Sequence, residues 1–160
     1  MINTGSPISD LDIKRLEKKC KLSLPQGYRE FLLKFNGGHC DPDFFPIHGL
    51  KGNSIGHIQL FFGINHPIES CRPEWNYQTF LGRMPNGFFP IACEDGGNII
   101  CISLFGDSEG KVFYWDHNGE TYPPSFDNVY KIADSFDGFL KSIHSHMETA
   151  PPALPVVGGF

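Results

Sequence analysis

Residues 88–115 read FFPIACEDGGNIICISLFGDSEGKVFYW, and this stretch decides the fold. It contains three short apolar or aromatic runs, at 88–93, 98–104 and 111–115, separated by connections rich in glycine and acidic residues. Runs of this length between turn residues are typical of β-strands. A parallel crossover would need a dozen or more residues, whereas these connections are short. The stretch therefore predicts three consecutive antiparallel strands.

Two apolar runs upstream, at 44–47 and 57–62, extend the predicted sheet from about residue 43 to about residue 116. The tetrapeptide Phe-Phe-Pro-Ile occurs at both 44–47 and 88–91, but its flanks differ, so we interpret the repeat as strand composition and not as duplication. Because proline cannot donate a hydrogen bond to a neighbouring strand, each copy predicts an edge strand or a bulge.

Two helices are predicted before the sheet. Ser9 and Asp12 have the spacing of a capping box, which places the start of the first helix there. Pro25 suits the first position of the second helix, and Asn36 with two following glycines suits its left-handed end. The apolar side chains of this second helix recur at i, i+3, i+4 and i+7: Tyr28, Phe31, Leu32 and Phe35.

The elements together predict a single α+β domain over residues 1–148, with a mostly antiparallel sheet flanked by two N-terminal helices and one C-terminal helix. The closing helix is expected over about 135–147, behind Asp134 as N-cap. A short irregular helix is expected between residues 67 and 81. Residues 149–160 contain three prolines and two glycines, and we expect this tail to be dispensable for folding.

Charge and targeting signals narrow the function classes. The 160 residues carry a formal net charge of −5, which argues against nucleic acid or an anionic membrane as the partner. The acidic excess peaks over residues 94–137, where nine acidic residues face two lysines, so a partner drawn there by charge should be basic. The five scattered cysteines form no C-x-x-C pair, and the first residues lack a signal-peptide pattern, so we expect a cytoplasmic protein.

The histidine-rich stretch from His39 to His66 is the one region with metal-ligand residue types. His39, His48, His57 and His66 recur at intervals of nine, with Cys40 and Asp41 beside the first. No pair has the close spacing of a zinc motif, so we interpret them as ordinary polar or half-buried histidines. No nucleophile, phosphate-binding or metalloprotease motif occurs either, so we expect no enzyme activity, cofactor or metal. A metal-binding enzyme that uses the His39–His66 region, or a cysteine–histidine pair assembled in space, stays a weaker alternative.

Four segments, taken in order, carry a resemblance to a known family. They are the helix of residues 24–38 with its Asn-Gly-Gly end, the run from Phe89 through Gly96-Gly97-Asn98 to Ile102, the strand of residues 110–117, and Ser135-Phe136-x-x-Phe139-Leu140. In this order they resemble the SMI/KNR-type proteins of the SUKH superfamily, over about residues 9–147. The resemblance implies an α+β domain that, in bacteria, acts as an immunity protein.

Such a protein binds and neutralises a cognate polymorphic toxin, often a nuclease or a deaminase, and has no universal active site. Fungal relatives are regulatory scaffolds, which leaves an intracellular scaffold as the alternative function. The matching residues are largely structural: Tyr28, Phe31 and Leu32 resemble core residues, and Trp115 resembles a large anchor on a strand. The sequence leaves the oligomeric state open.

The acidic residues between the strands are the candidate partner-binding site. We expect the loops of the meander to present them on one shared rim: Glu94, Asp95, Asp107, Glu109, Asp116 and Glu120. The alternative is a solvated rim that keeps the protein soluble. In that case the aromatic-rich stretch from Phe61 to Phe80 becomes the better candidate for the contact face.

Overall fold

The computed structural model describes residues 1–143, which form one α+β domain. The α-helices of this part are α1 (Asp10–Cys20), α2 (Gln26–Phe35), α3 (Pro73–Phe80) and α4 (Phe136–Ser142). The strands are β1 (Phe44–His48), β2 (Asn53–Phe61), β3 (Phe88–Glu94), β4 (Ile99–Ser103), β5 (Val112–Trp115) and β6 (Val129–Ala133). Three 3-10 turns lie between them: η1 (Glu69–Cys71), η2 (Gly106–Ser108) and η3 (His117–Gly119).

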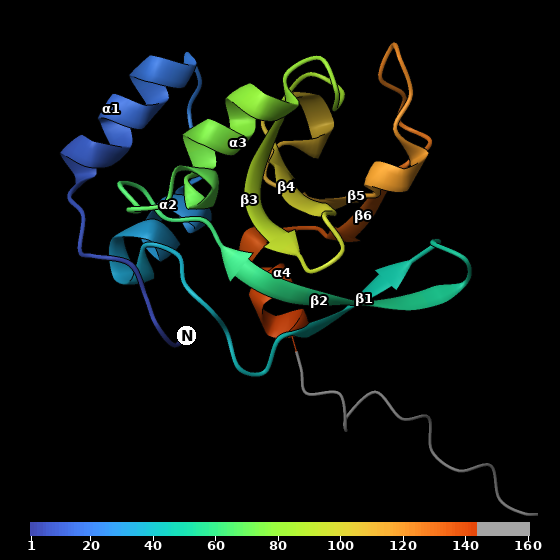
Figure 1. Cartoon of the computed structure of the whole chain (residues 1–160), viewed down its shortest axis with the longest axis horizontal. Coiled ribbons are helices and arrows are strands. Elements are labelled where there is room, and N and C mark those ends of the chain that lie inside the picture. Colours follow the sequence, from blue (N-terminus) through green and yellow to red (C-terminus); the bar gives the residue numbers. More distant parts are fainter. Residues whose placement is uncertain (144–160) are drawn as a thin grey trace, which may run out of the picture.

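The strands form one antiparallel sheet in chain order, β1 to β6, as the short connections predict (Figure 1). The two proline-containing strands behave as expected. Pro46 lies in β1, which is first in the strand order, and the register of β3 shifts between Pro90 and Ala92. The sheet curls so that β1 and β6 lie close together, with Gly49 beside the ring of Tyr130.

The two N-terminal helices begin and end close to where the sequence predicts. The backbone N–H of Ser9 donates to the Asp12 carboxylate over 2.8 Å at the start of α1. Pro25 stands one residue before α2 and not inside it. Asn36 ends α2 in the left-handed region, at φ +49°, and its N–H donates to the carbonyl of Leu32.

The C-terminal part of the fold corrects three expectations. The sheet does not end near residue 116, because β6 pairs with β5. The N-cap of α4 is Ser135 and not Asp134: the Ser135 hydroxyl accepts from the N–H of Gly138, while the Asp134 carboxylate accepts from Lys131 over 2.8 Å. α4 ends at Ser142, earlier than expected, because Ile143 after it is extended; residues 144–147 of the expected helix and the tail of residues 149–160 lie outside the described residues.

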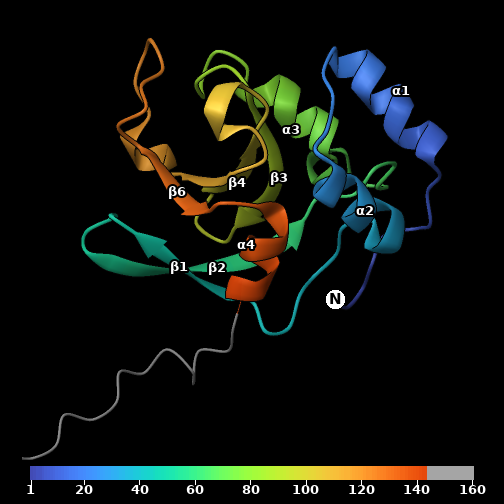
Figure 2. The ribbon, with the colours of Figure 1, turned by 180° about the vertical axis from the view of Figure 1, so that it is seen from behind.

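Two apolar clusters fill the two faces of the sheet. The larger cluster joins the sheet to α1, α2 and α4. Figure 2, the view turned by 180° from Figure 1, shows α4 lying over this face of the sheet. The smaller one lies on the opposite face: Phe62, Met84, Phe88, Ile99, Cys101 and Trp115. Because both faces of β3 and β4 are covered, residues 88–92 of β3 and all five residues of β4 are buried, and burial does not alternate along them.

Candidate functional site: acidic and aromatic surfaces

The six acidic candidates do not share one rim, which corrects the expectation. Successive connections of an antiparallel meander lie at opposite ends of the sheet. Glu94 is the last residue of β3 and Asp95 follows it, and Asp116 follows β5 at the same end. Asp107 and Glu109 lie in the connection between β4 and β5, at the other end.

Glu120 occupies a third position, in the long connection between β5 and β6. Its carboxylate accepts from the Arg83 guanidinium twice, at 2.8 Å and 3.0 Å. These hydrogen bonds hold the pKa of Glu120 below its usual value. The ion pair also ties this connection to the loop between α3 and β3, so the charge of Glu120 is largely neutralised within the chain.

Glu94 and Asp116 serve the fold itself. The Glu94 carboxylate accepts hydrogen bonds from the Asn98 amide, at 2.8 Å, and from the Tyr114 hydroxyl. Burial, together with the bond to Glu94, raises the pKa of Tyr114, which stays a neutral donor. Asp116 caps η3 by accepting from the N–H of Asn118 at 3.0 Å. These two carboxylates stabilise the turns that contain them and are less available to a partner.

Asp95 reaches a histidine at the edge of an acidic cleft. Nδ1 of His57 lies 3.0 Å from the Asp95 carboxylate, and Nε2 lies 2.7 Å from that of Asp43. The surrounding cleft has a volume of about 510 Å³, and Asp41 and His39 also line it. The two carboxylates contact opposite nitrogens of one ring, so they cannot converge with it on one ion. Within residues 1–143, no three His, Cys, Asp or Glu side chains are placed to hold a metal ion.

Cys40, which lines the same cleft, and Cys93 in β3 are not activated thiols. Burial, with a smaller contribution from Asp43, raises the pKa of Cys40 to about 11. Burial likewise raises the pKa of Cys93 to about 11. Both thiols are therefore protonated at neutral pH, whereas a nucleophilic cysteine needs a lowered pKa. The alternative of a cysteine–histidine enzyme finds no chemical support at these positions.

Exposed aromatic side chains lie in two of the connections that carry the acidic residues: Phe105 between β4 and β5, and Tyr122 and Phe126 between β5 and β6. Phe105 and Phe126 are 40% and 60% exposed, and Phe105 precedes Asp107 and Glu109 in the connection between β4 and β5. The expected fallback stretch from Phe61 to Phe80 buries Phe61 and Phe62, whereas Ile68 and Trp75 within it are exposed. Sequence reasoning missed Phe105 and Phe126, although an aromatic residue inside a polar, glycine-containing connection is a signal for them.

The fold and these surfaces define a small α+β domain with exposed acidic and aromatic side chains. The chain belongs to the SMI1 / KNR4 family (SUKH-1), whose family model matches residues 7–142. It is similar to the SPbeta prophage-derived uncharacterized protein YokK of Bacillus subtilis (strain 168), with 29% identity over 146 residues. That alignment covers 82% of this chain and 72% of the relative. No helix in residues 1–143 is both long and apolar enough to span a membrane.

Proposed function

We propose that this chain is an immunity protein that binds a cognate toxin in the cytoplasm and neutralises it without catalysis. The observation that carries the proposal is the family match over residues 7–142, since immunity is the role that the resemblance implies for bacterial SUKH proteins. The chemistry of the described side chains supports it, because the carboxylates Glu94 and Asp116 hold turns and the thiols of Cys40 and Cys93 are protonated.

The charge of the chain supports a nuclease or a nucleic-acid deaminase as the toxin. Such an enzyme binds a polyanion, so its active groove carries lysine and arginine. An acidic protein can occupy that groove and exclude the substrate. Carboxylates without a Lys or Arg partner within residues 1–143 are available to such a groove at either end of the sheet: Asp41, Asp43 and Asp95 at one end, and Asp107 and Glu109 at the other.

The test begins with the reading frames that adjoin the gene. Each is expressed in a host lacking this chain, alone and together with it, and growth is recorded. We expect one frame to encode a domain that stops growth, and co-expression of the chain to restore it. An unrelated acidic protein expressed at the same level is the control and should not restore growth. Absence of any growth-inhibiting domain, or inhibition that this chain does not relieve, would overturn the proposal and favour the scaffold role.

A further inference from the structure

An aromatic cluster lies on the sheet face opposite α1, α2 and α4. The buried ring of Phe88 has its centroid 5.6 Å from that of Phe105 and 6.1 Å from that of Phe126. Both outer rings are exposed although they come from different connections. Leu81, which is 55% exposed, lines the adjoining pocket with Phe88. We call Leu81, Phe105 and Phe126, with Phe88 beneath them, the aromatic face.

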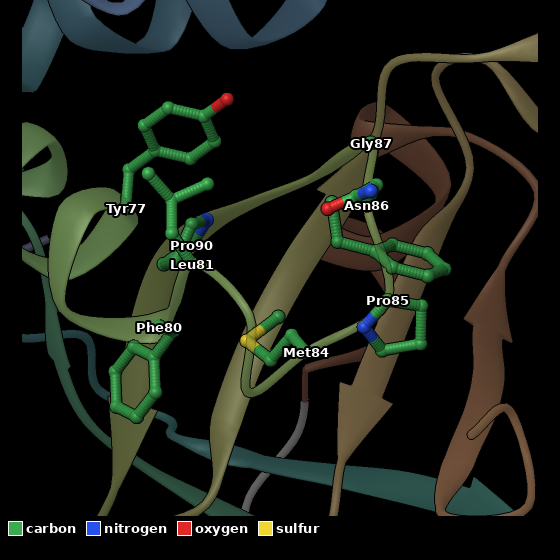
Figure 3. A pocket seen from close by; sticks show the side chains of 9 residues that line it. Tyr77, Phe80, Leu81, Met84, Pro85, Asn86, Gly87 and Pro90 are labelled. Carbon is green, nitrogen blue, oxygen red and sulfur yellow. The ribbon is translucent and has the colours of Figure 1, made fainter. Parts of the chain in front are cut away.

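The pocket beside Phe88 has a volume of about 120 Å³ (Figure 3). Phe80 at the end of α3 and Met84 and Pro85 in the following loop line it with apolar atoms, and polar atoms, those of Asn86 among them, make up as much of the lining. A hollow of this size suits one aliphatic side chain. Pockets that combine apolar and polar lining atoms are where anchor residues of a partner insert.

The backbone fixes the position of Phe105. A Cβ atom on Gly87 would lie 2.3 Å from the Phe105 ring, so the ring rests directly on a glycine. Gly87 also has a φ of +91°, which side-chain-bearing residues rarely adopt. The Phe105 ring is therefore held in place before a partner binds, which reduces the loss of side-chain conformational entropy on binding.

The charges around the aromatic face are mostly negative. Three exposed carboxylates form no ion pair with Lys or Arg in residues 1–143: Asp107, Glu109 and Asp127. Lys111 is the one basic residue in the connection between β4 and β5, which also contains Asp107 and Glu109. A second copy of this chain would bring like charges together across the contact. A basic partner instead gains attraction at the rim while its apolar side chain is buried at the centre.

The acidic cleft at the other end of the sheet lacks such an anchor. Asp43, His57 and Asp95 contact one another there, and the exposed apolar residue among the lining side chains is Ile2. Interface hot spots are enriched in aromatic residues at the centre of a contact, with charges at the rim. The aromatic face is therefore the better candidate of the two surfaces for binding the partner.

We propose that the toxin binds at the aromatic face, placing one apolar side chain against Phe88 and flanking lysine or arginine side chains against Asp107 and Glu109. This inference rests on the proposed function, which it narrows to one face. The segment of the toxin that binds here therefore has one apolar residue flanked by basic residues, and the toxin itself is a protein that binds nucleic acid.

The experiment measures binding of the full chain to the growth-inhibiting domain identified by co-expression. The double variant Phe105→Ala/Phe126→Ala should bind at least about 30-fold more weakly, as loss of a hot spot does. The matched control Leu11→Ala/Leu33→Ala removes two similarly exposed apolar side chains from α1 and α2, on the helical side of the molecule, and should bind as wild type. Melting curves of both variants report whether the fold is intact.

If Phe105→Ala/Phe126→Ala does not fold, the variant Asp107→Lys/Glu109→Lys tests the inference instead. It alters exposed charges and leaves stability nearly unchanged. Wild-type affinity in a folded aromatic variant, or wild-type association kinetics in the charge variant, overturns the inference. Loss of binding in Asp41→Lys/Asp43→Lys with the aromatic variant unaffected assigns the contact to the acidic cleft instead. If the wild-type chain does not bind the growth-inhibiting domain at all, the proposed function itself is contradicted. This outcome is distinguishable from the loss of binding in one variant.

Discussion

Phe31 shows how one side chain connects the helices to the sheet. Its ring centroid lies 5.0 Å from that of Phe61 in β2 and 5.1 Å from that of Phe136 in α4. The i, i+3, i+4, i+7 spacing predicts its burial, and the structure confirms it. Phe31→Ala should lower the free energy of unfolding by about 3–5 kcal/mol, because a large cavity opens where two elements meet. Chemical denaturation measures this, and a loss below about 1 kcal/mol would contradict the packing.

Glu17 gives the fold a pH dependence. Burial alone would raise its pKa, but hydrogen bonds from the Leu24 N–H, at 2.7 Å, and from Arg29 outweigh this effect and lower it. A carboxyl whose folded pKa lies below its unfolded value, about 4.3, stabilises the protein above that value. This stabilisation is lost as the pH falls through the folded pKa.

The stability difference between wild type and Glu17→Gln should therefore be present at pH 7 and shrink as the pH falls below about 4. Unfolding by denaturant at a series of pH values measures it. Glu30→Gln is the matched control, because Glu30 is exposed and receives a hydrogen bond only from Gln26, so its variant should follow the wild-type curve. A Glu17→Gln difference that stays constant down to pH 3 would show that the carboxylate contributes no pH-dependent stability.

At the scale of elements, Asn36 links the end of α2 to two other segments. Its buried amide donates to the carbonyls of Ser6 and Ile64, and its oxygen accepts from the N–H of Ile64. Asn36→Ala leaves these backbone groups without their partners, at about 1–3 kcal/mol for each group that stays buried. Thermal and chemical denaturation should both report the loss. Asn36→Gly keeps the left-handed backbone available, so equal damage in both variants identifies the amide, and an undamaged Asn36→Gly would identify the backbone alone.

The strands were predictable where their connections are short and rich in glycine. The turns at residues 94–97 and 106–110 mark β3, β4 and β5 clearly in the sequence. Strand β6 escaped prediction because it follows a long connection with two prolines and is half-buried along most of its length. The start of β2 also lies earlier than predicted, since Gly52 reads as a turn whereas pairing with β1 extends the strand to Asn53.

At the scale of the whole molecule, the acidic residues were identifiable from the sequence but their arrangement was not. Which end of the sheet a connection occupies depends on the strand count between connections, so Asp107 and Asp116 separate once the meander forms. The aromatic face is visible only in three dimensions, because Phe105 and Phe126 reach Phe88 from separate connections. The periodicity of residues within one helix or strand does not predict contacts between side chains from separate connections.

The excess of negative charge predicts a salt-dependent association rate. A basic toxin steered toward the acidic residues around the aromatic face should associate faster than about 10⁶ M⁻¹s⁻¹ at low salt. Raising the salt to 1 M shortens the screening length to about 3 Å, so the rate should fall toward about 10⁵–10⁶ M⁻¹s⁻¹. Stopped-flow mixing at several salt concentrations measures it. A rate independent of salt would mean that the carboxylates around the aromatic face are a solvated surface without a role in recognition.

Titration of the toxin's enzymatic activity tests most directly that this chain neutralises a toxin by binding. A fixed amount of the growth-inhibiting domain is mixed with increasing amounts of the chain, and its activity on its own substrate is followed. Neutralisation by binding predicts that activity falls in proportion to the chain added and ends at a fixed stoichiometric ratio. Inactivation of many toxin molecules by each chain would show catalysis, and full activity in the presence of excess chain would show that the two do not interact; either result contradicts the account.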